Sequence, residues 1–463
     1  MTDALTGYYK IKLLAREKRQ PVTALLALAA KNDPFYAGSS GSRQKAEWFA
    51  RLWKQLGFSA GVHLRRMHYQ LVSLAGTKKP DGLPYENTEG DWSYLCEAAK
   101  QARYLGLVAP EAFVDRRNPE PHLFRQDGLR RCPGWEPESV WWELPQIHAD
   151  LSGDLDWALP GYRIYGYEYG DDLQPFHIEV WAEKSTMNDV LVPVCRRYGI
   201  NLVTGLGFMS ITSVIELLKR VADSGKPCRV FYVSDFDPAG DGMPTAVARQ
   251  IEYWLHTYPL EVDIRLNPLV LTKEQVIAYK LPRTPIKETD RRKAHFEERY
   301  GEGAVELDAL EALYPGELAR LLEGAIARYR DDELPRKLRE TRKALEEMLA
   351  EEWAAALEPY QGKLETLKDE VYQVVKVYQK ELQALQQRLQ QDLEPYEERL
   401  DSLRRAVEDA IDSVAVPVPP LPEPERLVEP DDWLFDSRRS YEEQLARYKA
   451  RFGFSTGEKA SGS

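Results

Sequence analysis

Three acidic side chains follow predicted strands within one segment of the chain. Glu183 ends the apolar run HIEVWAE (177–183), and Asp235 and Asp237 stand in SDFDPAGDGM, where the run CRVFYVSD (228–235) ends. The carboxyl ends of parallel strands meet at one edge of a sheet, and residues two apart on a strand point to the same side. Carboxylates held this close need a cation or a shared proton, and oxygen ligands suit Mg²⁺. We therefore predict a Mg²⁺ site on Glu183, Asp235 and Asp237.

An Asp-x-Asp pair after a strand also has a simpler interpretation. It is typical of a strand-to-helix turn in which one carboxylate caps the helix. Pro238, Ala239 and Gly240 fit that turn and leave room for a phosphate. A glutamate at the end of an earlier strand of the same predicted sheet favours the metal site.

A second motif, RRMHYQL (65–71), lies on a predicted helix over 62–73. Arg65 and Tyr69 are four residues apart and share a face, opposite the apolar positions 64, 67 and 71. A guanidinium binds phosphate oxygens, and a tyrosine oxygen can act as a nucleophile. In the alternative interpretation, Tyr69 closes the helical core and Arg65 contacts only solvent or the phosphate backbone. His68 is more typical of packing than of a general base.

The elements that carry this second motif are predicted helices. They cover 43–56, 62–73 and 92–104, and a loop rich in Gly, Pro and Lys, with Lys78 and Lys79, separates the last two. Two helices joined by a glycine turn, a basic loop and a further helix resemble a winged-helix DNA-binding module. We expect Arg65, Arg66, Lys78 and Lys79 to contact DNA.

The elements that carry the carboxylates alternate between strand and helix. The predicted strands are 177–183, 200–205, 228–235 and 261–271, and the predicted helices are 187–198, 210–222 and 242–256. This alternation predicts a parallel sheet covered on both faces.

Long helices are predicted over 332–412. Apolar residues recur every three or four positions over 364–389 with one irregularity, and Pro359 and Pro395 are expected to bound that helix. Both an intramolecular hairpin and a dimeric coiled coil fit this length. The proline-rich stretch 414–425 predicts a semi-rigid linker, and 433–454 an amphipathic tail.

Charge is distributed unevenly along the chain. The 463 residues carry a net charge of −12, but the first 79 contain 14 Lys and Arg against 4 Asp and Glu. A basic module that binds a polyanion, attached to an acidic remainder, is expected. The four cysteines are far apart, and neither a membrane span nor a signal peptide is evident, so we expect a protein of the reducing cytoplasm, without membrane contact.

The order of these motifs resembles known families. The segment from 177 is similar to the Toprim domain of topoisomerases, primases and certain nucleases. It has a Glu after one strand, the glycine loop 204–207 after the next and DxDPxG after the third. Together with Arg-x3-Tyr on a winged helix, the chain resembles the A subunit of topoisomerase VI and the meiotic double-strand-break proteins. The chain also resembles a group of bacterial proteins with this architecture, and the resemblance covers 25–330 and, more weakly, the tail. The stretches that carry it are NDPFYAG, LRRMHYQLVS, LPRTPIKETDRR, VELDAL and WLFDSRRSY.

The resemblance implies a multidomain α/β fold with a winged-helix DNA-binding domain, a Rossmann-like parallel Toprim sheet and a coiled-coil-like C-terminal region. The expected divisions are an arm (1–40), the winged helix (41–135), a connector (136–176), the Toprim domain with an extension (177–330), the helical region (331–413), a linker (414–430) and the tail (431–463). The helical region is foreign to the topoisomerase A subunit.

The resemblance also implies a DNA topoisomerase-like enzyme, an isomerase or DNA endonuclease. Tyr69 would attack double-stranded DNA beside Arg65, and Glu183, Asp235 and Asp237 of the partner protomer would hold Mg²⁺, so a homodimer associated with the bacterial nucleoid is expected. The chain lacks a Walker A sequence, so ATP-coupled strand passage would need a separate ATPase.

Other functions stay open at this stage. The protein could be a Toprim nuclease in which water attacks the phosphate, or a non-catalytic DNA-binding scaffold. The basic residues 287 and 291–293 either follow a DNA backbone or pair with neighbouring acidic residues. The alternating Glu306 and Asp308 either add a carboxylate to the metal site or, as we expect, belong to an edge strand.

Overall fold

The computed structural model describes residues 7–74, 76–114, 118–125, 132–145, 155–258, 260–378, 386–425, 429–430 and 432–452. The chain divides into two compact units. The first unit comprises Met1–Asp127, Gln174–Asp331 and Glu425–Ser463, and the second unit comprises Gly128–Leu173 and Asp332–Pro424. None of the helices in the described ranges combines the length and apolarity that crossing a membrane requires.

The first unit is built on a five-stranded sheet in the order β4-β3-β5-β6-β7. Its strands are β3 (His177–Ala182), β4 (Asn201–Thr204), β5 (Cys228–Val233), β6 (Ile264–Val270) and β7 (Phe435–Asp436). The first four are parallel to one another, and Ala182 is level with both Thr204 and Val233. Every residue of β3, β4 and β5 is buried, as expected for strands covered on both sides.

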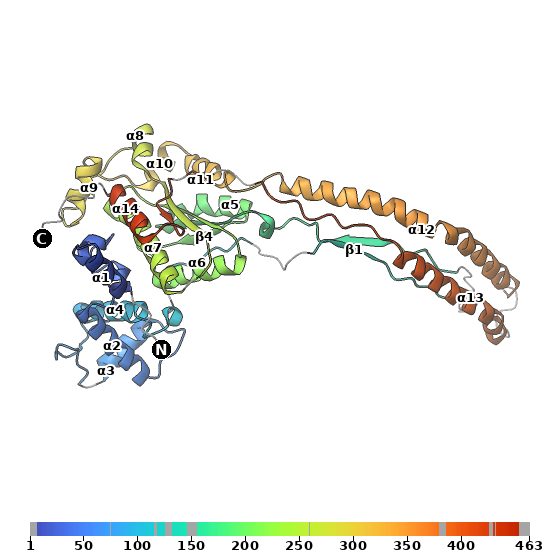
Figure 1. The fold of residues 1–463 in the computed structure, drawn as a ribbon, viewed down its shortest axis with the longest axis horizontal. Helices are drawn as coiled ribbons and strands as arrows, with labels where there is room; N and C mark the ends of the chain where they lie inside the picture. The colour runs from blue at the N-terminus through green and yellow to red at the C-terminus, as the bar shows by residue number, and fades with distance from the viewer. Residues whose placement is uncertain are drawn as a thin grey trace. The chain divides into compact units, whose positions relative to one another are not determined.

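Helices cover both faces of this sheet (Figure 1). They include α5 (Asn188–Tyr198), α6 (Ile211–Ser224), α7 (Pro238–Thr257) and α11 (Glu317–Ala327). Apolar residues of α6 and α7 pack with Trp181 and Val230 of the sheet, whereas those of α5 and α11 pack with Val180 and Phe231. The predicted strands and helices from 177 to 271, and the two-sided cover, are therefore confirmed.

The tail completes the sheet, which the sequence did not predict. β7 pairs antiparallel with β6, with Leu266 opposite Phe435, and α14 (Tyr441–Arg451) follows. The sheet is therefore mixed rather than wholly parallel as expected. Ion pairs also link the tail to the sheet. Asp436 Oδ2 lies 3.1 Å from Arg265 Nε of β6, and Glu429 Oε1 lies 2.6 Å from Arg229 Nη2 of β5.

The N-terminal part of the first unit is helical. It contains α1 (Gly7–Glu17), α2 (Ser40–Gln55), α3 (Leu64–Ser73) and α4 (Glu89–Tyr104). The last three confirm the predicted helices to within a few residues and share one apolar core around Phe49, Met67 and Leu95. A tight turn between α3 and α4 pairs Lys78 with Pro84.

Three short helices follow the sheet: α8 (Lys273–Ala278), α9 (Lys293–Tyr300) and α10 (Leu307–Leu313). The expected edge strand over VELDAL is wrong. Val305 makes a single bridge with Phe236, and the chain then enters α10. Strand pairing stops after Val305, because the Leu307 amide donates to the Asp235 side chain instead of to a neighbouring strand. Leu307 and Leu310 lie on one face of α10, and both are buried in the core.

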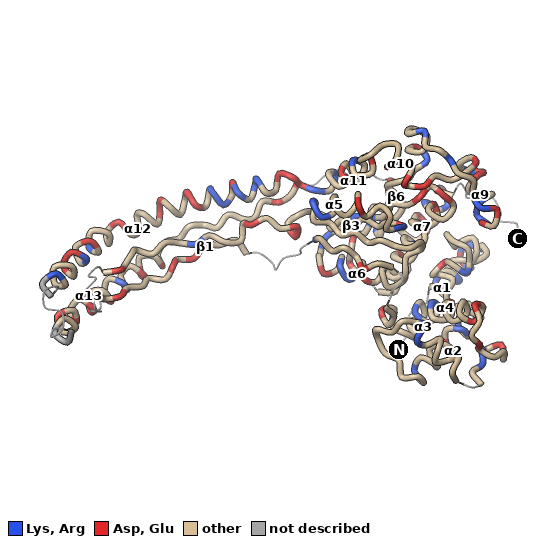
Figure 2. Tube along the Cα trace, turned by 180° about the vertical axis from the view of Figure 1, so that it is seen from behind, with Lys and Arg blue, Asp and Glu red and all other residues tan. Residues whose placement is uncertain are grey.

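The second unit combines a small sheet with two long helices. β1 (Gly134–Pro137) pairs antiparallel with β2 (Tyr162–Tyr165), and the helices are α12 (Leu334–Tyr378) and α13 (Gln386–Asp412). Residues early in α12 pack with residues late in α13, and the reverse holds at the other ends, so the two helices are antiparallel. Of the two alternatives, the intramolecular pair is therefore observed. Lys, Arg, Asp and Glu are interspersed along α12 (Figure 2).

The prolines of this region do not bound a helix as expected. Pro359 lies inside α12 and Pro395 inside α13. Side chains on both sides of Pro359, including Trp353 and Leu364, are buried in the helix pair, and this packing holds the helix together across the residue.

The proline-rich stretch 414–425 contains no helix or strand, which fits the predicted extended segment. It is packed rather than free, because Val416 is buried against Leu345 and Leu349. Tyr167 Oη also donates to the Pro419 carbonyl at 2.7 Å.

Candidate functional site

The parallel register brings Glu183 and Asp235 together where β3 and β5 end. The Glu183 amide donates to the Val233 carbonyl at 2.9 Å, which continues the ladder by one residue. The Asp235 amide then donates to Glu183 Oε2 at 3.1 Å. The predicted meeting of these two residues at one sheet edge therefore follows from backbone pairing.

Asp237 caps the helix that leaves this edge. Its Oδ1 accepts from the amides of Ala239 at 2.9 Å and Gly240 at 2.6 Å, at the start of α7. A Cβ at position 240 would lie 2.1 Å from the Asp235 carbonyl oxygen, so only glycine fits this turn. The helix-cap interpretation of Asp237 is thus confirmed, and Oδ2 has no hydrogen-bond partner among the described residues.

The three carboxylates lie close enough for their charges to affect the ionisation of Glu183 and Asp237. Burial, and then the charges of Asp235 and Asp237, raise the pKa of Glu183 to about 7. Burial also raises the pKa of Asp237, with a further contribution from Asp235, although the two backbone hydrogen bonds oppose it. Negative charge is therefore crowded at this edge in a way that a cation would relieve.

Sequence reasoning missed Lys184, which stands beside the carboxylates. Its Nζ lies 3.1 Å from Asp235 Oδ2, 2.7 Å from Asp308 Oδ2 and 3.8 Å from Glu306 Oε2. Glu306 and Asp308 thus reach the site through this lysine. The available signal was a lysine directly after the glutamate in WAEKS, together with the acidic pair of VELDAL.

The donor chemistry fits a hard divalent cation, although the geometry is not that of a formed metal cage. Over the described residues, no group of three or more His, Cys, Asp or Glu side chains is spaced to hold a metal ion. Glu183 Oε1 and Asp237 Oδ2 are carboxylate oxygens that accept no hydrogen bond from any described residue. Such oxygens are ligands that Mg²⁺ prefers.

The glycine loop after β4 folds onto the end of β3. The Gly205 amide donates to Ala182 at 2.8 Å, and the Gly207 amide donates to the Glu183 carbonyl at 3.1 Å. Gly207 has a φ of 97°, which favours glycine. The loop therefore holds the Glu183 backbone from the β4 side.

Tyr69 faces solvent on α3. Its side chain is 57 % exposed, whereas Met67 and Leu71 on the opposite face are fully buried. Tyr69 therefore does not close the helical core, and Arg65 and Arg66 are exposed on the same helix. The Arg65 guanidinium lies 5.7 Å from the centre of the Trp92 ring.

His68 is buried and engaged. Its Nδ1 lies 2.7 Å from Tyr85 Oη, and its Nε2 lies 3.1 Å from Asn87 Oδ1. These contacts fit the packing role expected from the sequence and leave neither nitrogen directed to Tyr69.

The expected DNA-contacting lysines differ in their surroundings. Lys78 is exposed in the turn between α3 and α4, whereas Lys79 Nζ lies 2.5 Å from Asp91 Oδ1. The Lys79 charge therefore has a protein partner.

Two residues of the basic loop after the sheet pair with neighbouring acidic residues, which was one of the two alternatives. Arg292 pairs with Asp290 at 2.8 Å, and Lys293 pairs with Glu288. The pKa of Asp237 is raised mainly by burial, and the charge of Arg292 opposes this rise, so Arg292 lies near enough to act on the carboxylate edge. Lys287 and Arg291 are exposed.

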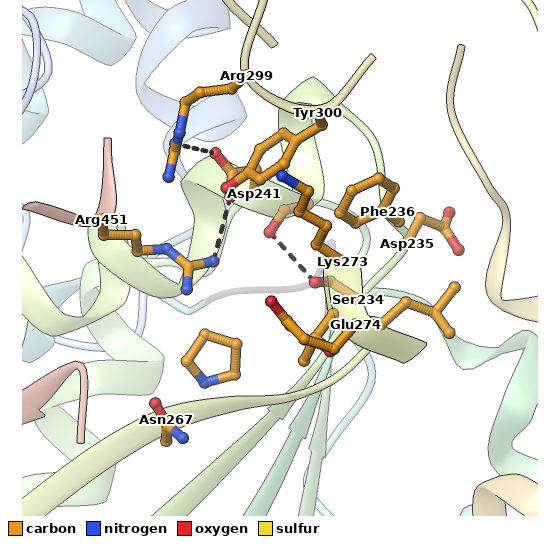
Figure 3. Close-up of a pocket in the computed structure, with 14 residues that line it drawn as sticks. Ser234, Asp235, Phe236, Asp241, Asn267, Lys273, Glu274, Arg299, Tyr300 and Arg451 are labelled. Atoms are coloured by element: carbon orange, nitrogen blue, oxygen red, sulfur yellow. Dashed lines mark hydrogen bonds and ion pairs between the residues drawn. The ribbon is translucent and has the colours of Figure 1, made fainter. Parts of the chain in front are cut away.

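A polar cavity of about 340 Å³ adjoins Asp235. Inside it, Asp241 of α7 receives Tyr300 Oη at 3.0 Å, Arg451 at 3.2 Å and Arg299 at 3.4 Å (Figure 3). The Asp235 carboxylate points away from this cluster. The sequence did not indicate the cavity, because α7, α9 and α14 build it from distant segments.

The fold and this edge define an α/β protein with an acidic site where parallel strands end. No protein-family model matches the chain, and a search of curated proteins found no significant match.

Proposed function

We propose that the protein is a Mg²⁺-dependent DNA-breaking enzyme of the topoisomerase VI A type. The observation that carries this proposal is the crowding of Glu183, Asp235 and Asp237 at the strand ends, which raises the pKa of Glu183 to about 7. Perturbed acidic groups at a parallel-sheet edge are typical of functional sites.

In the proposed reaction, the Tyr69 hydroxyl oxygen attacks a phosphorus atom of double-stranded DNA. A tyrosine–phosphorus bond to the 5′ end forms, the bond to the 3′ oxygen breaks, and the phenolic proton ends on the released 3′ hydroxyl. Arg65 binds the phosphate oxygens, and its position one helical turn from Tyr69 suits that role. Mg²⁺, when bound, stabilises negative charge on the phosphate. Glu183 and Asp237 are the residues that would hold it, with Asp235 beside them.

The proposal also includes the architecture of the resemblance. It assigns the N-terminal helices to a winged-helix domain and the sheet to a Toprim domain. It also takes double-stranded DNA as the substrate and a homodimer as the active form. A separate ATPase partner and a nucleoid location belong to it as well. Arg66 and Lys78, both exposed, are the further DNA contacts that it favours.

Exposure of the Tyr69 ring supports tyrosine as the nucleophile, because no described residue engages its hydroxyl. Hydrolysis by water is the second candidate, and the contacts of His68 favour it. Both His68 nitrogens are taken, so α3 offers Tyr69 no base of its own.

The test is Tyr69→Phe, which removes only the hydroxyl. Protein, supercoiled plasmid and Mg²⁺ are incubated, the reaction is stopped with SDS, and protein–DNA adducts are compared with and without protease. We expect cleavage and the adduct to vanish while DNA affinity stays near wild type. Tyr9→Phe is the matched control, because this exposed tyrosine lies on α1. A Tyr69→Phe protein that still cuts identifies water as the nucleophile.

A mixture of Tyr69→Phe and Glu183→Ala chains tests the shared site of the proposed dimer. A mixed dimer keeps one centre with both parts, so it should nick without making double-strand breaks. Absence of nicking, with subunit exchange verified, contradicts a dimer in which each site combines the tyrosine of one protomer with the metal of the other.

A further inference from the structure

Lys184 makes three carboxylate contacts, to Asp235 after β5 and to Glu306 and Asp308 at α10. We propose that Lys184 is a built-in cation that positions Asp235 and restricts this edge to one divalent ion per chain. The inference rests on the proposed Mg²⁺ site and specifies how many ions that site takes.

Asp235 is held through both of its carboxylate oxygens. Oδ1 accepts the Leu307 amide at 2.7 Å, and Oδ2 lies 3.1 Å from Lys184 Nζ. Its backbone amide is also bound, because it donates to Glu183 Oε2. Asp235 therefore links β3, β5 and α10 through these contacts, and its carboxylate oxygens are not free to bind a metal ion.

The oxygens that remain define a small site. Glu183 Oε1 and Asp237 Oδ2 are carboxylate oxygens without a hydrogen-bond partner in the described structure. Two metal ions in a shared site stand about 3.5–4 Å apart and are bridged by carboxylates. The second position would need the Asp235 and Asp308 oxygens, which the Lys184 ammonium already occupies.

Lys184 keeps its charge in this setting. Burial opposes ionisation, but the hydrogen bond with Asp308 and the charge of Asp235 outweigh it, so the pKa of Lys184 is raised. The ammonium, 3.1 Å from Asp235 Oδ2 and 2.7 Å from Asp308 Oδ2, thus lies where a second cation would otherwise sit.

The test counts ions without requiring catalysis. Free Mn²⁺ is measured by electron paramagnetic resonance while Mn²⁺ is titrated into wild type, Lys184→Met and Lys184→Arg. We expect one ion per chain for wild type and for Lys184→Arg. For Lys184→Met we expect either a second ion or at least about tenfold tighter binding of the first, because a competing charge is gone. Lys273→Met is the matched control, since Lys273 lies near the edge without bonding Asp235.

Two results would overturn the inference: two ions bound by wild type, or a Lys184→Met titration identical to wild type. The wild-type count decides even if Lys184→Met fails to fold. Two ions together with plasmid cleavage reject the inference and leave the proposed function standing. One ion without any cleavage rejects the function and leaves the ion count standing.

Discussion

Two glutamates on one strand have opposite surroundings. Glu179, in the middle of β3, is fully buried and receives Arg220 through Nε at 2.7 Å and Nη2 at 2.9 Å. His177 and Trp181 also bind it, each at 2.9 Å. Burial opposes its ionisation, but Arg220 and His177 hold the pKa of Glu179 far below its usual range.

Glu183, one residue past the end of the same strand, has carboxylates where Glu179 has cations. Burial and the charges of Asp235 and Asp237 raise its pKa to about 7. The sign of the neighbouring charge therefore separates a structural ion pair from a candidate site. Glu179 stabilises the fold when ionised, whereas Glu183 belongs to the proposed cation site.

The largest expected effect is on cleavage. Glu183→Gln removes a proposed metal ligand while it preserves size, so we expect Mg²⁺-dependent plasmid cleavage to fall by about 10³-fold or more. Glu261→Gln, at an exposed glutamate, is the control and should cut like wild type. Undiminished cleavage by Glu183→Gln would remove the basis for the carboxylate site.

The next effect is on stability. Glu179→Gln leaves the largely buried Arg220 guanidinium without the carboxylate that it binds, so we expect the free energy of unfolding to fall by about 3 kcal/mol. Urea titration followed by circular dichroism measures this loss. Glu183→Gln in the same assay should lose nothing, since it relieves repulsion. Equal losses in the two variants would mean that the contrast between the glutamates is false.

The pH dependence should also differ in sign. The pKa of Glu183 is about 7 in the folded protein against 4.5 as its ordinary value, so the fold binds an extra proton between these values. The contribution of Glu183 to stability is therefore lost as pH rises from about 4.5 to about 7. Glu179, with its lowered pKa, contributes stability above about 4.5 that is lost as pH falls through its folded pKa.

Thermal unfolding in EDTA checks the Glu183 direction. The midpoint of Glu183→Gln should match wild type near pH 4, exceed it increasingly up to about pH 7 and keep that difference above pH 7. A constant difference across this range would show that Glu183 does not titrate near 7.

The smallest expected effect is stabilisation by the ion. Mg²⁺ at ten times its dissociation constant should stabilise wild type by about 1.4 kcal/mol, because it binds only the folded state. Glu183→Gln should lose this gain, whereas Glu179→Gln, compared at a temperature where it is folded, should keep it. Thermal melts with and without Mg²⁺ at pH 8 measure both.

The sequence by itself determined the four parallel strands β3 to β6, the helices between them and the meeting of Glu183 with Asp235. These depend on local patterns: apolar runs between helices specify parallel strands, and parallel strands end at one edge. The exposure of Tyr69 also followed from helical spacing, because Met67 and Leu71 bury the opposite face.

Only the tertiary structure decided which charges meet. Lys184 engages Asp308 across more than a hundred residues, and β7 reaches β6 from the far end of the chain. The pairing of α12 with α13 likewise kept Pro359 inside a helix. Such contacts leave no periodic signal, because their free energy comes from groups that become neighbours only after the chain has folded.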